Sequence, residues 1–272
     1  MRRVDGRPQV VAHRGSSHEK PEHTLAAYIA ALDTGAEGLE CDVRLTSDGH
    51  LVCVHDRRVD RTTNGRGVVS VMDLAALDEL DFASWKNPWG ELDDEPPEMD
   101  EETRKVLTLQ RLLEVVCDYD RPVDLAIETK HPTRYAGLVE RRLVELLTRF
   151  DLAGPGSPAR VMSFSPVALT RVKRLAPALD VVLLIDRLLS RPGYTGMLRG
   201  DWIVGPGIQL LRESPRLGRR LRQRDRRMHV WTANTAEEFD LCLSLGAEAV
   251  ITDDPRGALE HLNGPASAVG PP

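Results

Sequence analysis

The apolar positions of the chain form short runs that alternate with longer stretches of helical periodicity. The apolar run at residues 10–12 is followed by Leu25, Ala26 and Ile29, whose spacing places them on one face of a helix. Gly35 then predicts the end of that helix. Further runs of the same kind predict strands at residues 38–43, 124–127, 161–164, 181–185, 202–204, 229–232 and 249–252. The periodic stretches predict helices at residues 22–34, 108–118, 136–150, 166–176, 186–199, 214–227 and 235–245.

Strands and helices alternate along the chain, so consecutive strands are expected to run parallel and to be joined by helical crossovers. Eight such strands predict a closed (β/α)8 barrel of the TIM type rather than an open sheet. The length of 272 residues suits this fold, which typically needs about 250 residues. We expect residues 1–262 to form one barrel domain and the Pro- and Gly-rich residues 263–272 to be a disordered tail.

One segment interrupts the alternation after the second strand. Extended runs at residues 43–45 and 50–56 flank the sequence Thr-Ser-Asp-Gly at residues 46–49, which predicts a turn. The three segments together predict a β-hairpin that rises from the end of the second strand. We expect Leu45 to pair with His50 across this hairpin.

That register would place Glu40 opposite His55, so that two residues far apart in the sequence meet in one site. The residues that follow, 60–105, show no regular period and contain several Gly, Pro and Trp residues. We expect them to form an insertion on the rim of the barrel. The acidic side chains at residues 91–102 are expected to be solvated surface.

The composition is that of a soluble globular protein, with 41% hydrophobic and 29% charged residues, which excludes disorder of the whole chain. The net charge of −6 gives no global basic field for nucleic acid. The chain shows neither an apolar run of the ~18 residues that an integral membrane segment needs nor the apolar core of a signal peptide. The four cysteines lack paired spacing and are expected to be reduced thiols. These features predict a cytoplasmic location.

Candidate catalytic residues lie at predicted strand ends, where barrel enzymes build their active sites. His13 ends the first strand, and a histidine there can act as an acid or a base near neutral pH. Arg14 beside it can hold a phosphate through two hydrogen bonds. The tripeptide His-Arg-Gly would also fit a purely structural turn, so further residues are needed to decide between a turn and a catalytic site.

Three carboxylates point to a metal site. Glu40 and Asp42 alternate on the second strand, so both are expected to face the barrel interior. Two ionised carboxylates there would be costly without a cation, unless one faces outward or pairs with Arg or Lys. Glu128 follows another apolar strand and supplies a third oxygen ligand, while Lys130 adds a positive charge on the same side. Oxygen ligands alone favour Mg²⁺ or Ca²⁺ over Zn²⁺.

Together these clusters describe a site suited to metal-assisted cleavage of a phosphodiester. The metal and the basic side chains would neutralise the phosphate and the charge that develops on it. His13 and His55 would serve as general base and general acid, in either order. The attacking group could be water or a hydroxyl of the substrate itself.

The order of these motifs resembles that of the glycerophosphodiester phosphodiesterase family. The resemblance covers residues 10–255, which is nearly the whole chain. Its motifs are His13-Arg14-Gly15, Pro21-Glu22-His23-Thr24, Glu40-Cys41-Asp42-Val43, Thr46-Ser47-Asp48-Gly49, His55-Asp56, Ile127-Glu128-Thr129-Lys130, Ser163-Phe164, Trp231-Thr232-Ala233-Asn234 and Ile251-Thr252-Asp253-Asp254-Pro255.

The resemblance implies a TIM-type barrel with an insertion after its second strand. It also implies a small-molecule substrate, namely a glycerophosphodiester that is hydrolysed to glycerol 3-phosphate and an alcohol such as choline, ethanolamine or glycerol. Such an activity belongs to lipid and glycerol metabolism. The site residues that it implies are an acid/base pair, His13 and His55; metal ligands, Glu40, Asp42 and Glu128; phosphate contacts, Arg14 and Lys130; and apolar pocket walls, Phe164 and Trp231.

The chain departs from the family pattern at one position. The family usually has asparagine after Pro-Glu in the second motif, where this chain has His23, which is bulkier and can titrate. We expect His23 only to flank the helix that begins at Thr24; if it contacts the site instead, substrate preference or pH dependence would differ from the family's. Glu22 is retained, and we expect it near the metal or a catalytic histidine, in contact with substrate. Asp253 and Asp254 are expected to form a turn or a helix cap and not to bind the metal.

Three alternatives stay open beside this interpretation. A lysophospholipase D-type activity on a larger diester is a close variant, which would need a wide apolar entrance. A non-catalytic barrel that binds phosphate-bearing ligands is a second alternative, although such proteins usually lose a histidine or a carboxylate. A nucleic-acid phosphodiesterase steered by the basic residues 216–227 is a third, and the negative net charge argues against it.

Overall fold

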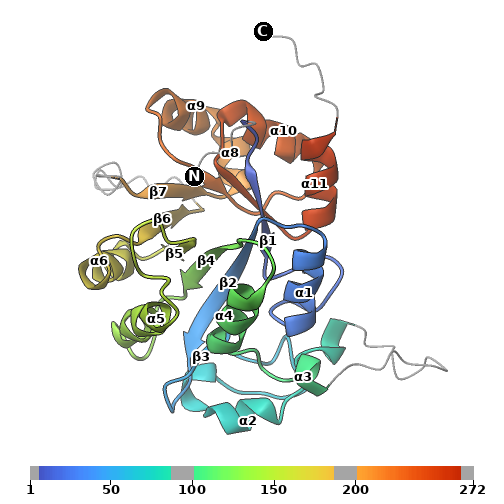
Figure 1. Ribbon diagram of the computed structural model, residues 1–272, viewed down its shortest axis with the longest axis vertical. Coiled ribbons are helices and arrows are strands. Elements are labelled where there is room, and N and C mark those ends of the chain that lie inside the picture. Colours follow the sequence, from blue (N-terminus) through green and yellow to red (C-terminus); the bar gives the residue numbers. More distant parts are fainter. Residues whose placement is uncertain (1–5, 87–100, 187–200, 265–272) are drawn as a thin grey trace, which may run out of the picture.

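The computed structural model describes residues 6–86, 101–186 and 201–264. Its sheet has nine strands, surrounded by helices (Figure 1). The strands are β1 (Gln9–His13), β2 (Gly38–Leu45), β3 (Leu51–Cys53), β4 (Asp124–Thr129), β5 (Ala159–Ser163), β6 (Asp180–Ile185), β7 (Ile203–Pro206), β8 (His229–Val230) and β9 (Ala249–Thr252). The helices are α1 (Leu25–Asp33), α2 (Leu74–Asp78), α3 (Glu101–Arg104), α4 (Leu109–Asp118), α5 (Leu138–Arg149), α6 (Pro166–Leu175), α8 (Ile208–Glu213), α9 (Pro215–Gln223), α10 (Ala236–Leu245) and α11 (Pro255–Asn263).

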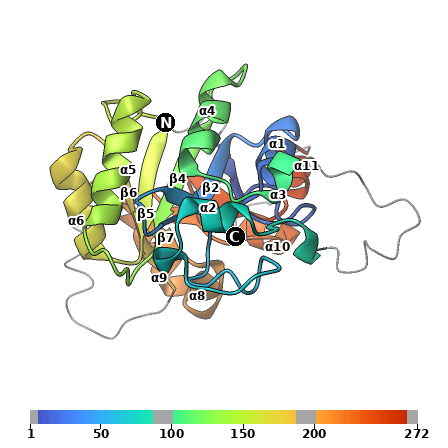
Figure 2. The same ribbon diagram turned by 90° about the horizontal axis from the view of Figure 1, so that it is seen from below.

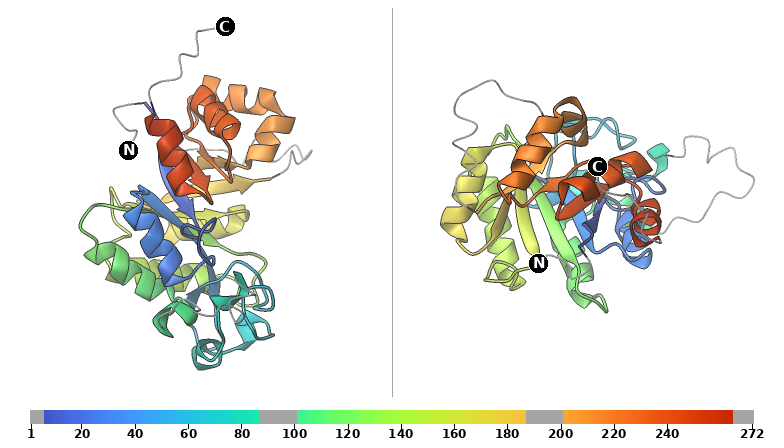
Figure 3. Two further views of the ribbon diagram at one scale, coloured as in Figure 1. Left: turned by 90° about the vertical axis from the view of Figure 1, so that its right-hand side faces the viewer. Right: turned by 90° about the horizontal axis from the view of Figure 1, so that it is seen from above.

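The parallel strands close into a barrel in the order β7-β6-β5-β4-β2-β1-β9-β8. The first and last strands of this order, β7 and β8, are brought together by parallel bridges from Val204 to Met228 and from Gly207 to Trp231, which close the ring. Helices cover the outside of this ring, and β1 packs against α11 near the two ends of the described chain (Figure 3). The predicted TIM-type barrel is therefore confirmed, and each crossover returns its next strand in the same direction.

The barrel is held by two kinds of apolar packing. Side chains such as Val11, Met162 and Ile251 fill the inside of the strand ring, whereas larger clusters lie between the strands and the helices outside. Four of the helices, α1, α4, α6 and α10, begin where a hydroxyl side chain caps a free amide of the first turn; in α1, Thr24 accepts from Ala27 N. With the interior closed by apolar packing, polar chemistry is confined to the ends of the strands.

The hairpin after β2 is present, but its predicted register is wrong by one residue. Leu45 pairs with Leu51 and not with His50. The reason lies in the turn, because Thr46 N donates to His50 O (2.9 Å) and His50 N donates to Thr46 Oγ1 (2.9 Å). These bonds leave a three-residue loop that ends with Gly49 at φ 90°, where glycine avoids the steric cost of a left-handed conformation. Glu40 consequently does not lie directly opposite His55.

The insertion after β3 consists of short elements. Besides α2 and α3 it contains 3-10 turns at Val69–Val71 and Ser84–Lys86. Its own small apolar cluster includes Val59, Leu77 and Phe82, packed against Val52 of β3. Figures 1 and 2 show α2 and α3 gathered at one end of the molecule, beside the hairpin.

Helix predictions differ from the structure mainly near the carboxyl end. The predicted helix 214–227 is shorter, because α9 ends at Gln223, and it is preceded by α8. Helix α11 was not predicted, although Asp254 caps it by accepting from Gly257 N and Pro255 occupies its first turn. The predicted helix 186–199, the tail from residue 265 and most of the acidic stretch 91–102 lie outside the described residues.

Two further expectations concern the chain as a whole. All four cysteines are free thiols, and Cys41, which lies between Glu40 and Asp42, is buried. Within the described ranges, no helix combines the length and apolar character that crossing a bilayer requires.

Candidate active site

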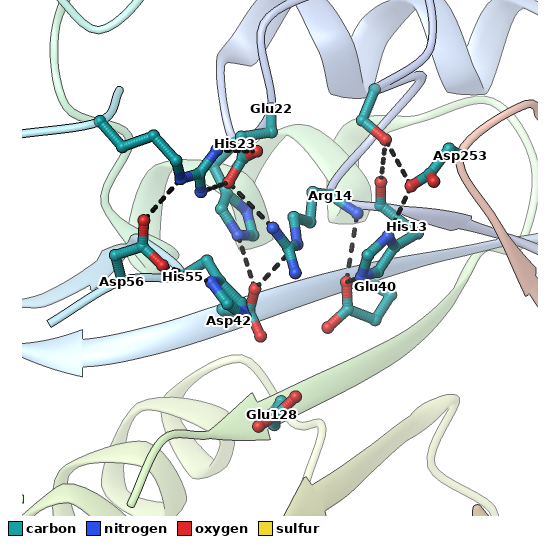
Figure 4. A network of polar contacts seen from close by, with 12 residues as sticks. His13, Arg14, Glu22, His23, Glu40, Asp42, His55, Asp56, Glu128 and Asp253 are labelled. Carbon is teal, nitrogen blue, oxygen red and sulfur yellow. Dashed lines mark hydrogen bonds and ion pairs between the residues drawn. The ribbon is translucent and has the colours of Figure 1, made fainter. Parts of the chain in front are cut away.

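The registers of the parallel strands bring the predicted site residues together. His13 at the end of β1 is the partner of Glu40 on β2, and Asp42 is the partner of Glu128 on β4. Lys130 follows β4 directly. Glu40 and Asp42 lie within the long strand β2, but the registers align them with the carboxyl ends of β1 and β4. The side chains of His13, Glu40, Asp42 and Glu128 therefore meet at one end of the barrel (Figure 4).

Glu40, Asp42 and Glu128 form a compact carboxylate cluster. One oxygen from each lies within 4.8 Å of the others, and their exposed fractions are only 1%, 1% and 7%. The ammonium of Lys130 lies 2.8 Å from Asp42 Oδ1 and 2.9 Å from Glu128 Oε2. The interior orientation that the alternation on β2 predicted is therefore present, and the cluster also has a lysine partner.

The charges of this cluster are only partly balanced. Burial and the charge of Asp42 raise the pKa of Glu40 well above its usual range and that of Glu128 to about 7. Burial acts in the same direction on Asp42, but Lys130, His23 and Arg14 outweigh it and hold the pKa of Asp42 well below its usual range. Burial and the neighbouring charge of Asp42 thus disfavour the ionised forms of Glu40 and Glu128.

This cluster fits a divalent metal ion. Its donor set consists of carboxylate oxygens alone, which suits hard cations such as Mg²⁺ and Ca²⁺. The raised pKa values of Glu40 and Glu128 point the same way, because a nearby divalent charge favours the ionised carboxylates that burial disfavours.

The loop after β1 turns sharply to place Arg14. Arg14 and Gly15 adopt φ values of 58° and 83°, and a Cβ at Gly15 would lie 2.6 Å from the backbone carbon of Ala27. This turn lets Arg14 N donate to Glu40 Oε2 at 3.1 Å. Its guanidinium lies 3.0 Å from Glu22 Oε1 and 3.2 Å from Asp42 Oδ2. Arg14 therefore links the loop to the carboxylate cluster.

His13 is oriented by an aspartate from the opposite end of the sequence. Its Nδ1 lies 2.6 Å from Asp253 Oδ1, while its Nε2 is 4.0 Å from Glu40 Oε2. Ser17 Oγ and Asn234 Nδ2 donate to the two oxygens of Asp253 at 2.9 Å and 2.7 Å. These partners lower the pKa of Asp253 against the effect of burial. An ionised Asp253 accepts a hydrogen bond from the Nδ1–H group of His13 and leaves Nε2 directed into the site.

The expectation that Asp253 is only a turn or cap residue is therefore wrong, whereas Asp254 does cap α11. Asp253 follows β9, which pairs with β1, so it lies at the same end of the barrel as His13. The signal that could have found it is the one used for the other residues, namely an acidic side chain directly after a barrel strand.

His55 has a matching partner next to it in the sequence. Its Nδ1 lies 2.7 Å from Asp56 Oδ1. Arg61 Nε donates to Asp56 Oδ2 at 2.6 Å, and its two remaining nitrogens lie 2.8 Å and 2.7 Å from the oxygens of Glu22. Burial lowers the pKa of His55 to about 4, so its imidazole is neutral at pH 7. Arg61, which sequence reasoning missed, thus connects the insertion to the site.

Glu22 lies in this network as a bridge between two arginines. Burial would raise its pKa, but Arg61 and Arg14 outweigh that effect and lower the pKa to about 2. Among the described residues, Glu22 forms no hydrogen bond or ion pair with His13 or His55; it is linked to His55 through Arg61 and Asp56 (Figure 4).

His23 does more than flank α1, so that expectation is wrong. It is 5% exposed, with φ at 61°. Its Nε2 lies 2.9 Å from Asp42 Oδ2 and its Nδ1 lies 2.8 Å from Tyr28 Oη. Tyr28 in turn donates to the carbonyl oxygen of Glu40 at 3.1 Å. His23 therefore connects the loop after β1 to the strand that carries two of the carboxylates.

Phe164 and Trp231 form an apolar pair beyond β5 and β8. Their rings meet edge to face, with centroids 5.4 Å apart and an interplanar angle of 89°. Trp231 Nε1 donates to Gly205 O at 2.8 Å, which fixes the indole, whereas Phe164 is 38% exposed. The pair presents aromatic surface at the end of the barrel that carries the other residues.

Comparisons with known proteins agree on one family. A model of the glycerophosphoryl diester phosphodiesterase family matches residues 13–256. A probable glycerophosphodiester phosphodiesterase 1 of Mycobacterium tuberculosis is 46% identical over 92% of this chain and 90% of its own length. A glycerophosphodiester phosphodiesterase of Caldanaerobacter subterraneus is 32% identical over 90% of this chain and 94% of its own length.

A solved structure of similar fold carries a ligand. A phosphodiesterase of Oleispira antarctica in complex with the product sn-glycerol-3-phosphate superposes with a TM-score of 0.77. It is 25% identical to this chain, and the match covers 95% of this chain and 98% of that protein.

Proposed function

The chain belongs to the glycerophosphoryl diester phosphodiesterase family and is a phosphodiesterase of that kind, and on this premise we propose that it hydrolyses glycerophosphodiesters with the help of one divalent cation and two histidines. The products are glycerol 3-phosphate and a free alcohol. The observation that carries this proposal is the placement of His13 and His55 on either side of a buried carboxylate cluster (Figure 4).

Glu40, Asp42 and Glu128 would hold the cation, which we propose to be Mg²⁺ or Ca²⁺. When bound, it supplies positive charge to the phosphate and to the charge that develops on it. Lys130 already spans two of the carboxylates and so lies where a phosphate held at this cluster would meet its ammonium. Arg14 borders the cluster from the loop after β1 and adds a second positive charge.

The two histidines move the protons of the reaction. Hydrolysis forms a bond between phosphorus and the oxygen of water and breaks the bond to the alcohol oxygen. One imidazole Nε2 accepts the proton that water loses, and the other gives a proton to the departing alcohol oxygen. Asp253 and Asp56 hold the Nδ1 atoms of His13 and His55, so that both Nε2 atoms are available for these transfers.

The remaining residues are assigned to substrate binding. Glu22 fixes Arg14 and Arg61 and so shapes the polar side of the pocket. Phe164 and Trp231 offer an apolar wall to the carbon chain of the substrate. We propose a small glycerophosphodiester as the substrate.

The test is release of glycerol 3-phosphate from glycerophosphocholine, glycerophosphoethanolamine and glycerophosphoglycerol, with Mg²⁺, Ca²⁺ or a chelator. We expect metal-dependent release that falls at least about 100-fold in His13→Ala and in His55→Ala. The matched control is His50→Ala, because His50 is exposed on the hairpin. Release in the presence of chelator, or full activity of both variants, would contradict the mechanism.

Two other results would point to the alternatives. Turnover of lysophospholipids in place of all three small diesters would favour a lysophospholipase D-type activity. Binding of glycerol 3-phosphate without turnover of any diester would favour a barrel that only binds phosphate-bearing ligands.

A further inference from the structure

A cavity of about 400 Å³ lies beside the carboxylate cluster, between the hairpin, the insertion and the loop after β4. Its polar lining consists of Arg44, Arg57, Lys130, Arg134, Ser70 and Thr133, and the rest is mostly valine and proline. Lys130 belongs to the cavity and to the carboxylate cluster alike, because its ammonium contacts Glu128 at 2.9 Å. The cavity is therefore a side chamber of the active site.

This chamber is strongly and one-sidedly charged. Four of its lining residues are basic, and no Asp or Glu of the described ranges lines it. The Arg44 guanidinium donates to the carbonyl oxygen of His55 at 3.0 Å and 2.6 Å, so its partner is a dipole and not a charge. Arg57 and Arg134 form no ion pair with any residue that the structure describes.

Two arginines of the chamber, Arg44 and Arg57, carry like charges that disfavour each other. Burial is the main cause that lowers the pKa of Arg44; the carboxylates of the active site act against it, and Arg57 adds to the lowering. The positions are nevertheless fixed by the fold: Arg44 follows Asp42 by two residues on β2 and so faces the same side. Ser70 in the lining is held in place by Tyr135, whose hydroxyl donates to Ser70 O at 2.6 Å. An anion that enters the chamber would offset the repulsion between these like charges and so would be bound favourably.

We propose that this chamber binds a phosphate group on the alcohol part of the substrate, so that the enzyme prefers glycerophosphodiesters whose alcohol carries a second, terminal phosphate. This inference rests on the proposed function and names its substrate class. The glycerol part is common to all glycerophosphodiesters, whereas the alcohol part differs between them. We therefore assign the strongly basic chamber to the alcohol part, where it can distinguish one substrate from another. Arginine suits a phosphate because its planar fork makes two parallel hydrogen bonds to the oxygens.

The volume agrees with this assignment. Ligand cavities commonly measure about 300–1,000 Å³, so the chamber can take a phosphate and a few carbon atoms that connect it to the reacting diester. A cationic alcohol such as choline would instead meet four basic side chains at this wall.

The test compares three diesters at constant ionic strength: glycerophosphocholine, glycerophosphoglycerol and the terminal phosphate monoester of glycerophosphoglycerol. We expect kcat/KM to be at least about tenfold higher for the phosphorylated diester than for glycerophosphoglycerol. In Arg57→Gln and in Arg134→Gln, that preference should fall at least about fivefold, mainly through KM. Arg58→Gln is the matched control, because Arg58 is an exposed neighbour that pairs with Asp60 outside the chamber.

Equal kcat/KM for glycerophosphoglycerol and for its terminal phosphate monoester in the unchanged protein would overturn the proposal. So would a preference that survives in both variants. If none of the diesters is hydrolysed, the proposed function fails, and the chamber is then tested by titration of inorganic phosphate in the presence of a chelator. Weaker phosphate binding in Arg57→Gln and Arg134→Gln than in Arg58→Gln supports an anion site, whereas equal binding in all four proteins overturns it.

Discussion

His23 Nε2 lies 2.9 Å from Asp42 Oδ2, and Lys130 contacts the other oxygen of the same carboxylate at 2.8 Å. The imidazole thus fixes the orientation of Asp42 through Oδ2, while Lys130 bridges Oδ1 of Asp42 to Glu128 in the carboxylate cluster. Residues that hold a ligand in this way commonly determine how well the ligand binds its ion. We therefore expect the histidine that departs from the family pattern to act on the candidate metal site through Asp42.

Replacement of His23 by asparagine tests this relationship. Asparagine tolerates the left-handed backbone of this position, where φ is 61°, but it is too short to reach Asp42 and Tyr28 together. We expect metal affinity to fall about 10–100-fold and the free energy of unfolding to fall by about 1–3 kcal/mol, because buried polar atoms lose their partners. Calorimetric metal titration and urea unfolding in chelator measure the two effects.

The control for this change is His50→Asn, on the exposed turn of the hairpin. Unchanged metal affinity in His23→Asn, with Asp42 still required for binding, would show that His23 does not position the ligand.

The contact between Asp253 and His13 yields a second prediction. In Asp253→Asn the uncharged amide no longer stabilises a protonated His13 and no longer selects the tautomer with a proton on Nδ1. We expect kcat to fall at least about 100-fold, with little change in the unfolding temperature. Asp254→Asn is the control, because asparagine also caps helices well and Asp254 only caps α11. A kcat within about threefold of that control would contradict the positioning role.

The parts of the site that follow from local patterns could be predicted from the sequence. Alternation on one strand places Glu40 and Asp42 on the same face, and a strand end places Glu128 at the same end of the barrel. Such inferences need only the period of a strand and the direction of its neighbours. The alternation of strands and helices along the chain allowed the barrel to be predicted in the same way.

The parts that the sequence did not predict depend on the exact path of loops. Arg61 reaches Glu22 and Asp56 only because the insertion folds back over the first loop. His23 is buried because the turn at Arg14 directs the chain inward. The hairpin register depended on whether the loop holds two or three residues, which the residue types alone did not decide.

The raised pKa of Glu128 predicts a pH-dependent metal site. Burial and Asp42 raise that pKa to about 7 in the metal-free protein, and metal binding requires the ionised carboxylate. Through Glu128 alone, the affinity should therefore fall by up to about tenfold per pH unit below pH 7, and binding at pH 6 should release protons. Calorimetry in buffers of different ionisation enthalpy measures the proton count. Absence of proton release at pH 6 would contradict the assigned protonation of the cluster.

A separate charged cluster lies at the opposite, amino-terminal end of the barrel. His229 on β8 is 2% exposed, and its Nε2 lies 3.4 Å from Glu248 Oε2. Arg227 pairs with the same glutamate at 2.8 Å, and Arg160 lies nearby. Burial, with the charge of Arg160, lowers the pKa of His229 to about 4. The fold therefore holds this imidazole neutral.

This histidine makes stability depend on pH in a defined window. Above pH 6.5, the usual pKa of histidine, the imidazole is neutral in the folded and the unfolded chain, so it adds no pH dependence. Between pH 6.5 and about 4 only the unfolded chain binds the proton, and the free energy of unfolding should fall by up to about 3 kcal/mol. Below pH 4 both states bind the proton, and the loss of stability levels off.

Urea unfolding of wild type, His229→Gln and the exposed control His50→Gln across this pH range measures the effect. We expect the loss to be reduced only in His229→Gln, and equal slopes in all three proteins would show that other groups cause the acid sensitivity.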